Sequence, residues 1–178
     1  TLAGFIVTNS QEISDKLRFL IKTVGSGLAP FDSWLILRGI KTLPIRMEKA
    51  QENAQAIVEF LLQEKKVTKV YYPGIEGTKA YEICKKQASG FGSMLTFEVE
   101  SKELALHILK STKLIPFAES LGGVETLLTY PTTQTHADVP EEVRIRNGIT
   151  DRVLRLSVGI EDKADLIADL KQAIDSYR

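Results

Sequence analysis

The stretch Leu154-Arg155-Leu156-Ser157-Val158-Gly159-Ile160-Glu161-Asp162 alternates apolar and polar side chains over the length of one strand and then reaches a glycine. Because successive side chains of a strand point to opposite faces of its sheet, we predict that the leucines and the valine pack in a core and that Arg155 lies on the other face. A guanidinium held on a rigid strand can bind a carboxylate through two parallel charge-assisted hydrogen bonds, as a site for an amino acid requires. A surface or structural ion pair explains a lone strand arginine at least as well, so the pattern leaves both roles open.

A second stretch, Glu119-Ser120-Leu121-Gly122-Gly123, precedes an apolar run from Val124 to Tyr130 that we predict to be another strand. A pair of glycines permits positive φ angles or a close approach of the backbone, so the loop can present Ser120 to a ligand. An ordinary tight turn fits the same spacing at least as well. On spacing alone the loop is a candidate binding loop and no more.

The charges of this 178-residue chain balance, with 23 basic and 23 acidic residues. No long block of either sign occurs, which argues against nucleic acid or an anionic membrane as a partner. The single cysteine, Cys84, excludes an intramolecular disulfide, and with only two histidines the chain lacks the ligands of a zinc cluster. We expect Cys84 and His107 to be ordinary structural residues.

The length of the chain suits one domain, or one domain with a piece of another, and is sufficient for a packed core. No apolar run reaches the roughly 18 residues of a membrane span, and the N-terminus lacks the features of a secretion signal, so we expect a cytoplasmic protein. The chain does not start with methionine, and residues 1–7 already have the pattern of a strand in the middle of a fold. We therefore expect a proteolytic or cloned fragment of a longer chain.

The first thirty residues predict a strand, a helix and a connector. The apolar, β-branched run over residues 2–8 predicts the strand, and Asn9 or Ser10 is expected to cap the helix. Gly25 is expected to stop this helix, and residues 28–31 to lead on from it.

A long helix is predicted next, because apolar side chains recur at steps of four and three from Ile36 to Leu61. Pro44 lies inside this pattern and removes a helical hydrogen bond, which predicts a kink or a short break. Such a helix typically bridges domains or subunits. A coiled coil is the alternative, although its alanines would form a weak seam.

The remaining residues alternate between short strands and helices. From about residue 63 we predict an α+β domain, with a small, mostly antiparallel sheet covered by helices on one side. Strands are predicted over residues 67–72, 93–99, 124–130 and 153–158, with a short one at 114–115, and helices over 78–88, 140–147 and after the capping residues Ser101 and Asp162.

Six segments, taken together and in order, resemble one family, the pyridoxal-phosphate enzymes of cysteine and methionine metabolism. This family includes cystathionine γ-synthase, cystathionine β- and γ-lyases and O-acetylhomoserine sulfhydrylase. Each segment is weak alone, but six in register along nearly the whole chain make the resemblance specific. The segments are Leu2-Ala3-Gly4-Phe5, Arg38 to Met47, Tyr72-Pro73-Gly74, Glu119 to Gly123, Thr135-His136-Ala137 and Arg155 to Asp162.

The resemblance implies the C-terminal domain of a fold type I pyridoxal-phosphate enzyme. It implies that residues 1–30 are the tail of the large cofactor-binding domain, that residues 31–62 form the helix connecting the domains, and that residues 63–178 form the C-terminal α+β domain. It also implies a homo-oligomer, since the family's tetramers place active sites between subunits.

The resemblance assigns substrate-binding roles to four residues. Arg155 is implied to hold the α-carboxylate of the substrate, and Ser120 to lie beside the substrate and the Schiff-base lysine. Leu121 is implied to contribute a backbone contact, and Glu119 to affect which side chain is accepted. A glutamate at this position resembles γ-synthases and γ-lyases more than the classical bacterial β-lyases.

The sequence also departs from the family. No segment resembles the Ser-x-Thr-Lys-Tyr context of the Schiff-base lysine, the glycine-rich phosphate-binding segment, the aromatic residue on the ring or the aspartate at its nitrogen. Lys22 and Lys41 lie in predicted helical segments and do not fit that lysine. We therefore expect no catalytic residue in this chain, and expect pyridoxal 5′-phosphate to act only in the full-length enzyme.

The resemblance implies the C-terminal part of a trans-sulfuration enzyme of methionine biosynthesis. We expect a cystathionine γ-synthase or O-acyl-homoserine thiolyase, which replaces the γ-substituent of an activated homoserine. The implied small-molecule partners are O-acyl-homoserine, cysteine and cystathionine. The alternatives are a fragment of a cystathionine β- or γ-lyase, or a non-catalytic module that binds an amino acid or promotes oligomerisation.

Overall fold

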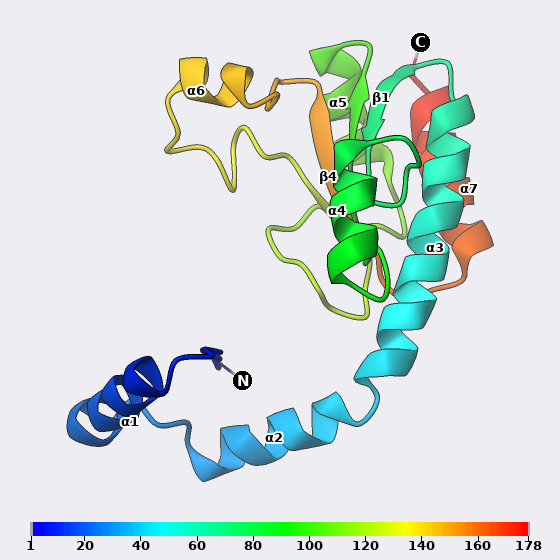
Figure 1. Cartoon of the computed structure of the whole chain (residues 1–178). Coiled ribbons are helices and arrows are strands. Elements are labelled where there is room, and N and C mark those ends of the chain that lie inside the picture. Colours follow the sequence, from blue (N-terminus) through cyan, green and yellow to red (C-terminus); the bar gives the residue numbers. More distant parts are fainter. Residues whose placement is uncertain (1, 178) are drawn as a thin grey trace. The chain divides into compact units, whose positions relative to one another are not determined.

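The chain divides into two structural units, the first ending at Pro44 and the second beginning at Ile45. This division is seen in a computed structural model that describes residues 2–177 (Figure 1). The assignment of residues 1–30, 31–62 and 63–178 to three parts of a larger enzyme stays a prediction.

The first unit contains two helices, α1 (Gln11–Val24) and α2 (Pro30–Ile40). The Ser10 hydroxyl accepts the amide hydrogen of Ile13 at 3.3 Å, and Gly25 ends α1 with a φ of 76°. The predicted cap and stop are therefore confirmed. The predicted connector over residues 28–31 is too long, because α2 already begins at Pro30, where the fixed φ of proline favours the first helical turn.

The predicted strand over residues 2–8 is wrong within the part of the chain that the structure describes. These residues have no strand assignment, and the side chains of Leu2 and Val7 are 92% and 91% exposed. A strand is defined by ladder hydrogen bonds to a neighbour, and an apolar β-branched run does not supply that neighbour. Thr1, which the prediction of a strand over residues 1–7 also includes, lies outside the described residues.

The predicted long helix is interrupted as expected. Helix α2 ends at Ile40, and after a short turn α3 (Leu43–Gln63) begins, with Pro44 in its first turn. Proline lacks the amide hydrogen that would continue the preceding helix, and the first turn of a new helix does not need it. The apolar positions of α3 from Ala50 to Leu61 are buried in the core of the second unit, where a coiled coil would have left them for another chain.

The second unit is built on a four-stranded sheet in the order β1-β2-β4-β3. Every pair of neighbouring strands is antiparallel, which confirms the predicted α+β class. All four strands lie where they are predicted, although the third is shorter than the predicted 124–130. The strands are β1 (Val67–Tyr71), β2 (Met94–Val99), β3 (Leu127–Thr129) and β4 (Val153–Ser157).

The core lies between one face of this sheet and three helices, α3, α5 and α7 (Figure 1). Leu95 and Phe97 of β2 pair with Leu156 and Leu154 of β4, and all four side chains are buried on this face. Burying one such side chain contributes roughly 1.5–3 kcal/mol. Besides α3, the helices of this unit are α4 (Lys79–Gln87), α5 (Lys102–Ser111), α6 (Glu141–Arg146) and α7 (Lys163–Asp175).

The predicted short strand at residues 114–115 is wrong, because a carboxylate takes its backbone donors. Asp169 of α7, only 6% exposed, accepts the amide hydrogens of Lys113, Leu114 and Ile115 at 2.8, 2.9 and 2.9 Å. These charge-assisted hydrogen bonds satisfy donors that would otherwise need a neighbouring strand. Asp169 therefore fixes the chain between α5 and the loop at residues 119–123.

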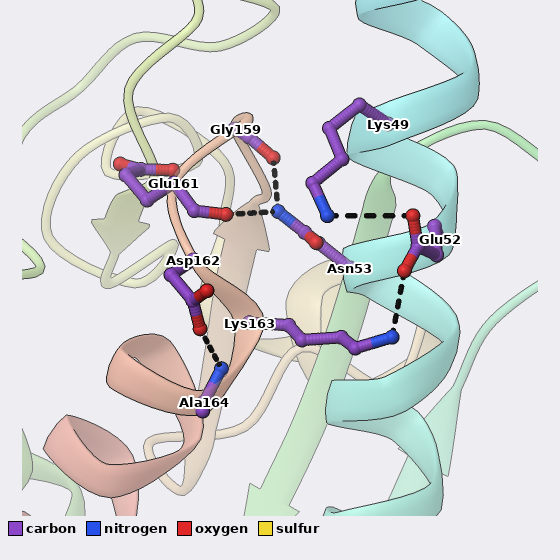
Figure 2. Close-up of polar contacts among 8 residues, drawn as sticks. All are labelled: Lys49, Glu52, Asn53, Gly159, Glu161, Asp162, Lys163 and Ala164. Atoms are coloured by element: carbon purple, nitrogen blue, oxygen red, sulfur yellow. Dashed lines mark hydrogen bonds and ion pairs between the residues drawn. The ribbon is translucent and has the colours of Figure 1, made fainter.

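A buried asparagine fixes the segment that follows β4 (Figure 2). The Asn53 side chain of α3 is fully buried, and its amide nitrogen donates to the carbonyl oxygens of Gly159 and Glu161 at 3.1 and 2.7 Å. At the exposed edge of the same region, Lys163 donates to Glu52 at 2.6 Å. This hydrogen bond holds the pKa of Glu52 below its usual value and raises the pKa of Lys163.

The same segment is joined to the chain entering β3. The Glu161 carboxylate accepts the amide and hydroxyl hydrogens of Thr126 at 2.6 and 2.8 Å, and the amide of Gly159 donates to the Thr126 hydroxyl oxygen at 2.9 Å. A Cβ atom at Gly159 would overlap the backbone carbonyl oxygen of Val124 and lie 2.6 Å from the Glu161 carboxylate. Glycine is required here by close backbone approach, not by a positive φ.

Replacing Asp169 by Asn is expected to lower the free energy of unfolding by about 3 kcal/mol, because three backbone donors, one of them at the buried Ile115, lose a charged acceptor. Urea unfolding followed by circular dichroism measures the change. The matched control is Asp165→Asn on the exposed surface of the same helix, which is expected to change stability by less than about 1 kcal/mol. Equal losses in the two variants would contradict the role given to Asp169.

Replacing Gly159 by Ala is expected to cost about 2 kcal/mol, because the methyl group forces Val124 and Glu161 apart. Hydrogen exchange should show faster exchange at the amides of Thr126 and Ile160, which are hydrogen-bonded across this contact. Gly27→Ala is the control, since its Cβ would meet only an ordinary contact at 3.8 Å. Unchanged protection in Gly159→Ala would show that the contact is not restrictive.

Candidate functional site

Arg155 lies in the centre of β4, on the face opposite the core. Its neighbours across the sheet are Thr96 of β2 and Thr129 of β3. The guanidinium is half-buried, and its Nη2 atom donates to the Thr129 hydroxyl oxygen at 3.3 Å. The sheet therefore places this side chain as the alternation in its strand predicts.

The guanidinium of Arg155 is not neutralised within residues 2–177. It forms no ion pair there, and its Nε atom is buried without a hydrogen-bond partner. A buried donor without an acceptor is costly, and a carboxylate that accepts two hydrogens from one guanidinium would satisfy it. The structural ion pair that the sequence left open is not formed by the described residues.

The loop that carries Glu119, Ser120 and Leu121 is hydrogen-bonded at its two ends to strands β3 and β4. At one end, the Thr129 hydroxyl donates to the carbonyl oxygen of Ala118 at 3.0 Å. At the other end, the amide of Gly122 donates to the Ser157 hydroxyl oxygen at 2.8 Å. Gly122 has a φ of 77°, which L-residues with a side chain rarely adopt, so the glycine permits this turn.

Glu119, Ser120 and Leu121 lie between these two attachments and are exposed, with Leu121 at 57%. The loop and Arg155 share Thr129, because one hydroxyl accepts from the guanidinium and donates to the residue before Glu119. The substrate-binding roles of all four residues stay predictions.

Sequence reasoning missed the threonines that join the loop to the strand. Thr129 is 1% exposed and Thr126 is fully buried, yet each makes side-chain hydrogen bonds across elements. Two threonines in an otherwise apolar run were the available signal, since a buried hydroxyl needs a partner. The partners themselves are distant in sequence and could not be named from the run.

The remaining titratable groups singled out from the sequence make local contacts. Cys84 is half-buried with its Sγ atom 3.3 Å from the carbonyl oxygen of Gly90, and His107 hydrogen-bonds to serine hydroxyls. Burial raises the pKa of Tyr72 to about 12, and its hydroxyl donates to the Gly92 carbonyl oxygen at 2.8 Å. These contacts fit the ordinary roles expected for Cys84 and His107.

The lysines of the described chain do not fit the covalent attachment of pyridoxal phosphate. A Schiff-base lysine is activated by a desolvated or cationic environment. Every lysine among residues 2–177 is exposed except Lys49 and Lys66, which are half-buried. Lys49 pairs with Glu52, and Lys66 donates to the carbonyl oxygens of Ile174 and Tyr177. The described lysines therefore lack the desolvated environment that activates a Schiff-base lysine.

Residues 2–177 contain neither a group of metal-binding side chains nor a helix that could span a membrane. No three His, Cys, Asp or Glu side chains there are grouped so that they would hold a metal ion. No helix in that range combines the length and apolarity that a membrane span requires.

Solved structures contain the same arrangement of elements. Cystathionine γ-synthase from Xanthomonas oryzae pv. oryzae, solved in complex with aminoacrylate and cysteine, is 38% identical and superposes with a TM-score of 0.89 over 95% of this chain and 44% of that one. Cystathionine γ-lyase from Lactobacillus plantarum, complexed with L-serine, is 39% identical with a TM-score of 0.87, over 96% of this chain and 45% of that one. The predicted fold is thereby confirmed.

The curated relatives include a lyase and a synthase. Cystathionine β-lyase of Lactococcus lactis subsp. cremoris (strain MG1363) is 46% identical over 98% of this chain, and cystathionine γ-synthase of Haemophilus influenzae is 48% identical over 99%. The chain spans 46% and 44% of these two relatives, less than half their length. Residues 1–175 match the family described as Cys/Met metabolism PLP-dependent enzyme. The chain therefore belongs to this family of pyridoxal-phosphate enzymes.

Proposed function

We propose that the protein containing this chain forms a carbon–sulfur bond at an activated homoserine, as a cystathionine γ-synthase or O-acyl-homoserine thiolyase. The observation that carries the proposal is the guanidinium of Arg155, which is fixed on β4 with a buried donor that has no partner among the described residues. A cation held in this way suits the α-carboxylate of an amino acid.

The residues of this chain have binding and orienting roles in the proposal. Arg155 binds the α-carboxylate, and Thr129 restricts the rotation of the guanidinium through the hydrogen bond at 3.3 Å. Ser120 and Leu121 contact the substrate from the fastened loop, and Glu119 selects among substrate side chains. Membership of the family implies pyridoxal phosphate as cofactor of the full protein, where it supplies the electron sink for carbanion chemistry at the substrate.

The surface of the first unit supports the proposed homo-oligomer. Neither α1 nor α2 has a buried residue, and large apolar side chains such as Phe19, Phe31 and Trp34 are more than half exposed. Apolar surface of this kind favours association. We propose that the full protein covers part of it with a second copy, in a homotetramer.

A lyase is the second candidate function, and the relatives support it about as well as they support a γ-synthase or thiolyase. Cystathionine γ-lyase of Dictyostelium discoideum is 49% identical over 97% of this chain, a similarity comparable to that of the γ-synthase. In this alternative the same carboxylate site holds cystathionine while its carbon–sulfur bond is broken. A non-catalytic amino-acid-binding or oligomerisation module remains the third candidate.

The products distinguish these candidates when the full-length protein is supplied with pyridoxal phosphate. Cystathionine made from O-acetyl- or O-succinyl-homoserine and cysteine supports the γ-synthase, and homocysteine made with sulfide supports the thiolyase. Pyruvate or 2-oxobutyrate released from cystathionine alone supports a lyase. An absence of turnover with every substrate, although pyridoxal phosphate is bound, would favour the non-catalytic module.

Replacing Arg155 by Gln in the full-length protein is expected to raise the KM for the amino-acid substrate on the order of 10- to 100-fold, because a charged hydrogen bond contributes about 1.5–3 kcal/mol. Arg155→Lys should show a smaller rise in KM than Arg155→Gln but should not reach the wild-type value, since an ammonium cannot form the two parallel hydrogen bonds. Steady-state kinetics measure both. Arg146→Gln, an exposed arginine of α6, is the control. A KM in Arg155→Gln equal to that of the control would refute the carboxylate role.

A further inference from the structure

A cavity of about 710 Å³ lies in the second unit. Its walls come from α5, from the segment after β3, from α6 and from the chain that leads into β4; Figure 1 labels α5, α6 and β4. Neither Arg155 nor any of Glu119, Ser120 and Leu121 lines it. The volume falls in the range of small-molecule sites.

Arg144 of α6 is a cation without an anion in this wall. Its Nη1 atom donates to the carbonyl oxygen of Thr132 at 2.7 Å, and its Nε atom is buried without a partner. It forms no ion pair within residues 2–177. The Thr132 hydroxyl, in the same wall, is also buried without a partner. A guanidinium has five donors, so the tether to Thr132 leaves donors for a ligand.

The other arginine of the wall, Arg152, is already neutralised. It pairs with Glu98 at 2.6 Å, and the Glu98 side chain is only 12% exposed. Lys102 is 3.9 Å from Asp151, and both side chains are about half exposed. Arg144 is therefore the cation of this lining that lacks a carboxylate partner in the described structure.

Glu141 lies one helical turn before Arg144 on α6 and also lines the cavity. It is exposed and forms no ion pair within the described residues. Residues three apart on a helix have Cβ atoms roughly 5–6 Å apart on one face. An anion and a cation at this spacing match a ligand that carries an ammonium and a carboxylate on one carbon atom.

The rest of the wall includes apolar surface. Leu106 of α5 and Ile145 and Ile149 from α6 and the segment after it line the cavity, and Ile145 is 58% exposed. An apolar ligand group that covers these side chains removes their surface from water at roughly 25 cal/mol per Å². The wall thus pairs a polar end suited to a zwitterion with an aliphatic surface.

We propose that this cavity binds a free amino acid with an aliphatic side chain. Its carboxylate accepts hydrogen bonds from Arg144, its ammonium group donates to Glu141, and its side chain packs on Leu106, Ile145 and Ile149. This site is separate from the carboxylate site at Arg155 and does not depend on the proposed reaction.

The test is an NMR titration of the ¹⁵N-labelled 178-residue chain with L-leucine as the probe. Saturable shifts are expected at the amides of Ile149 and Thr150. Two comparators remove one charge each: 4-methylpentanoate lacks the ammonium group, and 3-methylbutylamine lacks the carboxylate. Each is expected to bind about tenfold more weakly than L-leucine. Shifts that stay linear up to the solubility limit of L-leucine, or equal affinity for all three compounds, would overturn the proposal.

Matched variants assign the two charges. Glu141→Gln, which leaves the tether between Arg144 and Thr132 intact, is expected to weaken L-leucine about tenfold and to leave 4-methylpentanoate unchanged. Arg144→Gln is expected to weaken both carboxylates about tenfold. Arg146→Gln on the same helix should leave binding unchanged, and Arg155→Gln should leave the shifts at Ile149 and Thr150 unchanged. Loss of the Ile149 shifts in Arg155→Gln, or their retention at full affinity in both Glu141→Gln and Arg144→Gln, would show that L-leucine binds elsewhere.

Discussion

The candidate site depends on one fully buried amide, the side chain of Asn53. It donates to two carbonyl oxygens of the segment after β4 (Figure 2). That segment in turn holds Thr126 through the carboxylate of Glu161. A helix and two chain segments, as far as 108 residues apart in the sequence, are thus fixed by one short network. The Oδ1 atom of Asn53 has no partner among the described residues, so this network tolerates one unsatisfied acceptor.

This network explains why an exposed loop can have a defined position. The residues from Glu119 to Leu121 have little packing of their own, but the loop is attached at Ala118 to β3 and at Gly122 to β4. Gly159 lies against Val124 and donates to Thr126, so the chain that leads into β3 is fixed to the chain that leaves β4. Loops that bind ligands are commonly mobile segments on a rigid scaffold, and here the scaffold is the sheet with its polar cross-links.

Local signals made most elements of the second unit predictable. The features that sequence reasoning got wrong or missed depend on partners that are distant in the sequence. Ser101 and Asp162 cap the helices expected of them, because the capping hydrogen bond forms within three residues. The strand predicted at residues 114–115 failed because Asp169, on another helix, captures its donors. Strand alternation and the glycine pair made Arg155 and Ser120 candidates, and the family resemblance added Glu119 and Leu121 and the substrate-binding roles. Thr129, which joins the loop to Arg155, follows only from the sheet register.

Arg155 and Arg144 are the two arginines among the described residues that keep a buried side-chain nitrogen without a hydrogen-bond partner. Most polar groups of the second unit are satisfied internally, as Asp169 and Glu161 are, yet Arg155 and Arg144 each keep a buried Nε atom without an acceptor. A buried donor left without an acceptor lowers stability, so folding alone does not explain either of these unpartnered Nε atoms. A ligand carboxylate removes the penalty at either position, so the same electrostatic reasoning connects the proposed substrate site and the cavity beside α6.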